Sequence, residues 1–290
     1  MRRWFWLCWL SISSLVSSQA MAQDVRIITS DWTVAETLVA LQHPPIGVGD
    51  KRAYERWVIE PKLPVSSVDL GLRTQPNIEL VLSLQPDYIV NAQWLQQALP
   101  NLPSLGQKIN LEFYSDKGHS WAQSVAATRT LGTLIKRPQA AEKLIHQTQT
   151  QLRQQGLAVA AWRDRPLAVV QFVDARHLRI YGTNSLYGTV LSMMSLNNAW
   201  PKVHNAWGAE QIDLTQLAKL PVNTLMVIVA PYPPHLAQQV AQNKLWLRLP
   251  FGQPQHTLNL PAVWSFGGLP AMGRFADVLS QRLQAQGGQS

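Results

Sequence analysis

The chain has 290 residues, of which 46% are hydrophobic and 14% are charged, and its formal net charge is +8. This composition excludes a disordered chain, and the length predicts one large domain or two smaller ones. The basic residues are scattered rather than gathered in one run, so we expect no binding to nucleic acid. The only cysteine, Cys8, lies close to the N-terminus, which leaves the rest of the chain without disulfides, cysteine nucleophiles or cysteine metal sites.

The first residues have the pattern of a secretory signal peptide. The basic start Met1–Arg3 precedes the apolar run WFWLCWLSISSLV, and Ala20–Ala22 has the small-x-small pattern of a cleavage site. We therefore predict that residues 1–22 are removed. An uncleaved membrane anchor is the alternative, but the apolar run is shorter than the ~20 residues that span a bilayer. An exported chain without disulfides or a lipid-bearing cysteine suits a soluble protein of a Gram-negative periplasm.

Strand and helix patterns alternate in the first part of the chain. We predict, in order, a strand at 25–29, a helix at 33–42, a strand at 46–49, a helix at 77–85 and a strand at 88–90. Ser30 or Asp31 can cap the first helix and Asn77 the second, while Pro86 ends the second. This order predicts a parallel sheet wrapped by helices.

A long helical region separates this part from a second alternating part. Residues 121–135 predict one helix, and residues 139–162 predict another that starts beside Pro138. We then predict strands at 167–172, 178–181, 224–230 and 260–264, and helices at 185–195, 214–220 and 271–283. The sequence thus predicts two α/β lobes joined by one long helix: an N-terminal lobe at 23–137, a connecting helix at 138–162 and a C-terminal lobe at 163–290.

The sequence contains no common enzyme motif. GxSxG, HExxH and the phosphate-binding GxxxxGK[ST] are all absent, and the seven histidines lack metal-ligand spacing. We regard His177 and His204 as the histidines best placed to approach a cleft, although packing or surface roles are commoner for such residues.

Several polar segments follow predicted strands and carry an aromatic residue or an arginine. They contain Trp57, Arg73, Trp94, Trp207, Trp264 and Phe266. In an open α/β sheet such segments gather at the carboxyl ends of the strands, where ligands bind. Indole rings offer broad apolar faces and arginine offers a planar fork of donors, so the set suits a bulky ligand with polar oxygens. Each residue taken alone could equally be a packing anchor or a solvated charge.

Longer stretches resemble a known family. They are YERWVIEPKLPVSSVDLGLRTQPNIELVLSLQPDYIV, YGTNSLYGTVL, NNAWPKVHNAWGAEQIDLTQLA and LPAVWSFGG. They are similar, in the same order, to ferrichrome-type periplasmic binding proteins, the soluble components of ABC importers for hydroxamate siderophores. The resemblance implies the class III fold, with two α/β lobes bridged by one long rigid helix and a shallow cleft between them. It also implies a non-enzymatic monomer without an intrinsic cofactor.

The resemblance also assigns roles to individual residues. An arginine in the GLRT loop bonds the ligand oxygens in this family, which implies that role for Arg73. Family tryptophans that line the cleft correspond to Trp57, Trp207 and Trp264, and the next family aromatic corresponds to Phe266. A ligand-binding tyrosine of the family has no match, and Trp94 is the nearest aromatic. For permease docking, which uses acidic residues, Glu210 is the candidate on the second lobe, and the residue on the first lobe stays open.

We therefore expect a periplasmic protein that captures a ferric hydroxamate siderophore and passes it to an inner-membrane ABC permease. The three hydroxamates complete the coordination of Fe(III), so the protein supplies donors and aromatic faces rather than an iron ligand. We expect no buried acid beside Arg73, because an acid would compete for its donors. Three alternatives stay open: the same fold with a catecholate siderophore, haem or a cobalamin; a secreted α/β hydrolase; and a module that binds only a partner protein.

Overall fold

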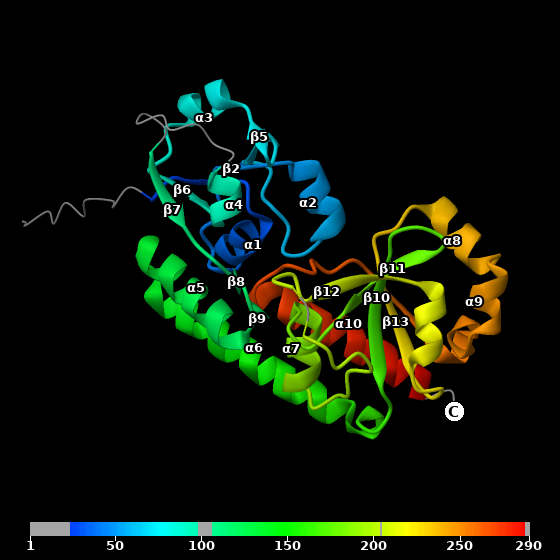
Figure 1. Ribbon diagram of the computed structural model, residues 1–290. Helices are drawn as coiled ribbons and strands as arrows, with labels where there is room; N and C mark the ends of the chain where they lie inside the picture. Colours follow the sequence, from blue (N-terminus) through cyan, green and yellow to red (C-terminus); the bar gives the residue numbers. More distant parts are fainter. Residues whose placement is uncertain (1–23, 98–105, 204, 288–290) are drawn as a thin grey trace, which may run out of the picture.

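The computed structural model describes residues 24–97, 106–203 and 205–287. The predicted signal peptide at 1–22 and His204 lie outside the described residues. Figure 1 shows two lobes, each built around its own sheet, with long helices running beneath both. Within the part of the chain that the structure describes, no helix combines the length and apolar character that crossing a bilayer requires.

The first sheet is wholly parallel, as the sequence predicts. Its strand order is β3-β2-β1-β6-β7, with β1 at the centre paired to β2 and β6. The strands are β1 (Ile27–Thr29), β2 (Gly47–Val48), β3 (Val68–Asp69), β6 (Tyr88–Asn91) and β7 (Gln107–Asn110). The helices of this lobe are α1 (Trp32–Ala40), α2 (Lys51–Trp57), α3 (Ile78–Leu84) and α4 (Gln93–Gln96). Asp31 caps α1 and Asn77 caps α3 through side-chain bonds to backbone amides, which confirms both predicted caps.

The second sheet is mixed, which the strand and helix pattern did not reveal. Its order is β12-β11-β10-β13-β14, and β11 runs antiparallel to both of its neighbours. The strands are β10 (Leu167–Phe172), β11 (His177–Tyr181), β12 (Ala209–Asp213), β13 (Leu225–Val229) and β14 (Thr257–Leu260). The surrounding helices are α7 (Leu186–Met193), α8 (Pro234–Ala241), α9 (Lys244–Arg248) and α10 (Leu269–Gly287), with short 3-10 turns at 214–219, 250–252 and 254–256. Strands β10 and β13 are buried throughout, as expected for central strands covered on both faces.

Two predicted elements end elsewhere than expected. The strand predicted at 260–264 was wrong in position: β14 covers Thr257–Leu260, because Pro261 cannot continue a ladder, and residues 261–268 form an irregular segment. The connecting helix α6 covers Pro138–Ala158 and has Pro138 in its first turn, but residues 160–162 form a separate 3-10 turn rather than its last turn. Helix α6 packs against both α5 (Trp121–Leu134) and α10, so it lies along the two lobes together (Figure 1).

One apolar core runs beneath both lobes. It joins residues of α1 and α2, such as Trp32 and Tyr54, to residues of the second sheet and of α10, such as Val227 and Phe275. Leu152 of α6 belongs to the same core and is fully buried. Because buried side chains of both lobes pack in this one core, the relative position of the lobes is fixed by packing rather than by a flexible linker.

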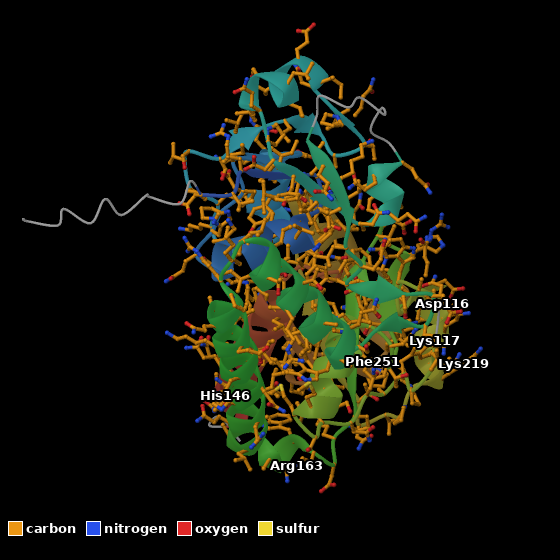
Figure 2. All side chains as sticks on the ribbon, turned by 90° about the vertical axis from the view of Figure 1, so that its left-hand side faces the viewer. Asp116, Lys117, His146, Arg163, Lys219 and Phe251 are labelled. Atoms are coloured by element: carbon orange, nitrogen blue, oxygen red, sulfur yellow. The ribbon has the colours of Figure 1, made fainter. Side chains whose placement is uncertain are left out.

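A hairpin between β7 and α5 adds polar contacts to this junction. Its strands are β8 (Tyr114–Ser115) and β9 (Gly118–His119), and Figure 2 labels Asp116 and Lys117 at its tip. The backbone amide of His119 donates to the oxygen of Asn184 at 2.9 Å, and Asn184 Nδ2 donates to the oxygen of Lys117 at 3.0 Å. The hairpin is therefore bound to the loop before α7 of the second lobe.

We expect Gly118→Ala to destabilise the protein by about 4 kcal/mol, since strained backbone and overpacking each cost roughly 2 kcal/mol. Gly118 has a φ of +93°, and a Cβ there would collide with the backbone oxygen of Asn184. Gly71 is the matched control, because its φ of +82° is similar but a Cβ there meets nothing within 4 Å. Urea denaturation of both variants checks the prediction, and an equal loss in both would contradict the role of the Asn184 contact.

Candidate functional site

Arg73 lies in the turn of a small hairpin formed by β4 (Gly71–Leu72) and β5 (Gln75–Pro76). Its Nε donates a hydrogen bond to the backbone oxygen of Ser30 at 2.8 Å. Because Ser30 directly follows β1, this bond fixes the arginine at the carboxyl end of the central strand. The two terminal nitrogens of Arg73 make no hydrogen bond to any residue that the structure describes, so they can donate to a ligand.

Three indole rings surround the Arg73 guanidinium. Its central carbon lies 4.3 Å from the ring centre of Trp32, 5.6 Å from that of Trp94 and 5.7 Å from that of Trp264. All three distances are within the range of cation–π attraction. The stacking restricts the guanidinium to one orientation, which lowers the entropy that binding would cost.

The rings around Arg73 extend into a connected aromatic cluster. We use this name for Trp32, Trp57, Trp94, Tyr114, Trp207, Trp264 and Phe266. Ring centres are 4.9 Å apart for Trp32 and Trp264, and 5.2 Å apart for Trp264 and Phe266. Phe266 also lies 5.2 Å from Trp207, and Trp207 lies 6.3 Å from Trp94. The cluster thus joins α1, α2 and α4 of the first lobe to the irregular segments of the second.

The exposure of the rings changes across the cluster. Trp264 at its base is 8% exposed, whereas Trp94 and Trp207 are 45% and 44% exposed. Large indole faces rarely stay this open on a soluble protein without a function, so the Trp94–Trp207 pair indicates a binding surface. Trp57 packs edge-on against Trp264 at 6.3 Å and is half-buried, which makes it a support for the base of the cluster.

Two acids act on Arg73 through space, so our prediction of no buried acid beside it was wrong. Burial lowers the pKa of the Arg73 guanidinium, and the charges of Asp31 and Asp50 oppose that effect. Asp31 is buried, and its carboxylate accepts from the amides of Thr33 and Ala92. Among the described residues neither acid forms an ion pair with Arg73, so its donors stay available. The sequence did not reveal these acids, because Asp31 and Asp50 are far from Arg73 along the chain.

Side chains of the first lobe and the hairpin hold the segment that carries Trp264 and Phe266. Thr33 Oγ1 donates to the backbone oxygen of Phe266 at 2.7 Å. The Tyr114 hydroxyl donates to the oxygen of Ser265 at 3.1 Å, and burial raises the pKa of that hydroxyl well above its ordinary value. The Tyr114 hydroxyl therefore stays protonated and remains a donor across the junction.

The structure brings six of the seven residues singled out from the sequence into one place. Arg73, Trp57, Trp94, Trp207, Trp264 and Phe266 all belong to or contact the aromatic cluster. Trp57 and Trp94 lie in short helices rather than in the predicted loops. Their role in binding stays a prediction that rests on this geometry.

Sequence reasoning missed Trp32 and Tyr114. Trp32 begins α1 directly after β1, so the rule that ligands gather at strand ends could have found it. Tyr114 lies in a hairpin without a sequence signal, and its ring is 6.4 Å from Trp207 and 6.2 Å from Phe266. It gives the cluster a tyrosine, although from a different segment than the loop in which the family resemblance expects one.

Glu210 and His177 lie on strands of the second sheet. Glu210 of β12 pairs with Ile180, and its predicted role in docking remains a prediction. His177 is at the end of β11 remote from the Tyr181–Ala209 pair, and its Nδ1 lies 2.8 Å from Asp174 Oδ2. His177 therefore takes part in a surface hydrogen bond with Asp174 rather than in the cluster that contains Trp207.

Two other kinds of site were considered beside the aromatic cluster: a metal centre and a cavity in the second lobe. The described residues contain no group of three or more His, Cys, Asp or Glu side chains placed to hold a metal ion. A cavity of about 1400 Å³ in the second lobe is lined by residues that include Phe172, Trp246 and Arg165, and it shares no residue with the cluster. Arg165 there is engaged with the backbone oxygens of Asn223 and Gln255.

Comparison with known proteins gives a consistent picture. Residues 27–263 match a family described as periplasmic binding protein. The chain is 28% identical over 258 residues to the iron(3+)-hydroxamate-binding protein FhuD of Escherichia coli strain K12, covering 89% of this chain and 86% of that protein. It is 29% identical over 215 residues to an achromobactin-binding periplasmic protein of Dickeya dadantii, covering 71% of this chain and 66% of that protein.

A solved structure shares the fold. The crystal structure of the Fe3+–Desferal-bound siderophore-binding protein FhuD from Vibrio cholerae superposes with a TM-score of 0.82 at 24% identity. The match covers 91% of this chain and 99% of that chain. The arrangement of two α/β lobes is therefore common to both proteins.

Proposed function

Since this chain belongs to the periplasmic binding protein family, we propose that it captures Fe(III)-hydroxamate siderophores and delivers them to an inner-membrane ABC permease. It acts as a binding component of transport and performs no chemistry on its cargo. The observation that carries the proposal is the aromatic cluster around Arg73, whose two terminal nitrogens are free to donate among the described residues. The similarity to the hydroxamate-binding protein of Escherichia coli supports the same cargo.

The charges around the cluster favour a neutral cargo. Arg73 supplies one positive charge, and Asp31 and Asp50 lie near enough to act on it with the opposite sign. A ferric complex of three hydroxamates is neutral, whereas a complex of three catecholates is strongly anionic. These three charges leave the site without net positive charge, so a strongly anionic complex gains nothing electrostatically there, because the acids would repel what Arg73 attracts.

The shape of the cluster suits the same cargo. A closed hydroxamate complex presents carbonyl and hydroxamate oxygens on one side and an organic frame on the others. Arg73 can donate two hydrogen bonds to those oxygens, while Trp94, Trp207 and Phe266 cover the frame. The iron keeps its complete coordination shell throughout, so binding needs no ligand atom from the protein.

A titration panel tests the proposed cargo. We expect ferrichrome and ferrioxamine to quench tryptophan fluorescence with a Kd of about 1 μM or below, and ferric enterobactin and haemin to bind at least about tenfold more weakly. Added salt should change the affinity for the neutral complexes little, because screening acts on net charges. Tight binding of haemin or of the catecholate complex alone would refute the proposal, and so would indifference to every ferric trihydroxamate.

A further inference from the structure

Glu36 of α1 is a fully buried carboxyl at the junction of the two lobes. Its Oε1 accepts a hydrogen bond of 2.7 Å from the backbone amide of Gly268, which directly precedes α10. Gly267 makes room for this contact, since a Cβ at that position would lie 2.7 Å from Glu36 Oε1. The first lobe therefore contacts the backbone of the second lobe through this side chain as well as through Thr33 and Tyr114.

The residues next to Gly268 carry the base of the aromatic cluster. Thr33 holds Phe266 and Tyr114 holds Ser265 by the hydrogen bonds described above. Glu36 holds Gly268, the point at which the irregular segment becomes α10. The orientation of Trp264 and Phe266 thus depends on three side chains from outside their own lobe.

We propose, on the premise of the cargo function above, that Glu36 is a positioning residue for cargo binding, because its carboxyl fixes Gly268 and thereby orients Trp264 and Phe266 toward Arg73. Glu36 itself is buried beneath these rings and does not contact the cargo. It acts through the backbone of residues 264–268.

The energetic cost of this carboxyl argues for a specific role. Its Oε2 is buried and has no hydrogen-bond partner among the described residues. A buried polar atom left in this way costs about 1–3 kcal/mol, and an apolar residue of similar size would avoid the cost. Packing alone therefore does not explain a glutamate here, whereas the bond to Gly268 does.

The groups that face Glu36 make its ionisation unfavourable. The pKa of Glu36 is raised to about 8, mainly by burial and to a smaller extent by the charge of Asp31, which caps the same helix, while the amides of Gly268 and Ala271 act in the opposite direction. Tyr54 of α2 and Tyr114 of β8 also face this charge, and both are neutral hydroxyls. The first turn of α10, Leu269–Met272, contains no titratable residue.

This environment predicts a dependence on pH. With a folded-state pKa of about 8 above the ordinary 4.5, the stability that the neutral carboxyl contributes is complete below pH 4.5 and is lost as pH rises through 8. Between pH 4.5 and 8 an opened, hydrated junction releases the proton that the packed junction keeps. The affinity for cargo should therefore fall as pH rises through this window, by up to about tenfold per pH unit, and level off above pH 8.

The test compares Glu36→Gln and Glu36→Leu with Glu79→Gln, a control at an exposed position of α3. Glutamine keeps the acceptor and stays neutral, whereas leucine removes the acceptor and leaves the Gly268 amide unpaired. We expect the leucine variant to bind ferrichrome about tenfold more weakly at neutral pH, because residues 264–268 lose the bond to Gly268 that holds Trp264 and Phe266 in one orientation. The glutamine variant should bind within about threefold of wild type at the acid end of this window and lose the decline between pH 4.5 and 8.

Readouts without cargo separate this inference from the proposed function. Deuterium uptake across residues 263–268 and the near-ultraviolet circular dichroism of the indoles should change in the leucine variant and not in Glu79→Gln. The inference would be overturned if the Glu36→Leu variant folds and matches wild type in deuterium uptake, in circular dichroism and in ferrichrome affinity. If that variant does not fold, a glutamine variant that keeps the wild-type pH profile overturns it instead. Failure of wild type to bind any siderophore would refute only the cargo.

Discussion

Replacing Arg73 with alanine is expected to weaken the binding of ferrichrome by about tenfold to more than a hundredfold. The reason is that hydrogen bonds to a charged donor contribute roughly 1.5–3 kcal/mol, and Arg73 can direct two of them at the cargo. The bond to Ser30 and the stacking on Trp32 already fix the orientation of Arg73. The side chain of the wild-type protein therefore loses little conformational entropy when it binds the cargo. Alanine removes the donors and leaves the aromatic rings in place.

The measurement is tryptophan quenching by ferrichrome, with Arg73→Lys and Arg176→Ala beside the alanine variant. Lysine keeps the charge but loses the planar fork, the stacking and the bond to Ser30, so an intermediate affinity is expected. Arg176 is an exposed arginine of the second lobe that lies outside the cluster, and its loss should leave the affinity unchanged. Equal binding by the Arg73→Ala and wild-type proteins would remove the basis of the proposed site.

The second large effect concerns stability: the free energy of unfolding should depend on pH through His119, a buried imidazole that joins the hairpin to α7. Thr189 Oγ1 donates its proton to the oxygen of Ser185, so it can only accept from His119 Nδ1 at 3.0 Å. His119 Nε2 in turn accepts from Ser124 Oγ at 2.9 Å. Burial lowers the pKa of His119 to about 4, and the neutral ring is the form that this hydrogen-bond network requires.

The sign of the pH effect follows from the two pKa values. Between about pH 6.5 and pH 4 the unfolded chain binds a proton at His119 that the folded protein does not, so the free energy of unfolding falls as the solution is acidified. The contribution of this one residue is about 3 kcal/mol, since each pH unit is worth about 1.4 kcal/mol. It is present above the ordinary pKa of histidine and is lost on the way down to about pH 4.

Urea denaturation of wild type and His119→Gln over this pH range isolates the effect. The difference in unfolding free energy between the two proteins should shrink by about 3 kcal/mol from the neutral to the acid end. His146→Gln is the matched control, because His146 is an exposed residue of α6 (Figure 2). A difference between wild type and His119→Gln that stays constant with pH would show that this histidine is not kept neutral by its surroundings.

Local signals in the sequence predicted the elements well. The buried run at 225–229, the caps at Asp31 and Asn77 and the proline at the start of α6 all depend on neighbouring residues. The antiparallel course of β11 was not predictable in this way, because a strand's direction depends on which other strand it pairs with. The two-residue strand β3 was not predicted, since two residues carry almost no periodicity, whereas β2 lies within the strand predicted at 46–49.

The candidate site, too, was predictable where it depends on local sequence signals and not where it depends on tertiary packing. A search for aromatic residues and arginines after predicted strands found most of the cluster, because strand ends bring such residues together. It could not place Asp31 beside Arg73, nor Tyr114 beside Phe266, since these pairs are far apart in the chain and meet only through tertiary packing. It also gave no sign of Glu36, which looks in the sequence like an ordinary polar residue of an amphipathic helix.

The single core shared by the lobes sets the conditions under which the protein can be unloaded. Prising the lobes apart would wet Trp32, Tyr54 and Phe275, and each Å² of apolar surface exposed costs about 25 cal/mol. Under the proposed function, a permease that takes the cargo would act at lower cost on Trp94 and Trp207, whose rings are already partly exposed. Release would then be a local event at these two rings, with the shared core still packed.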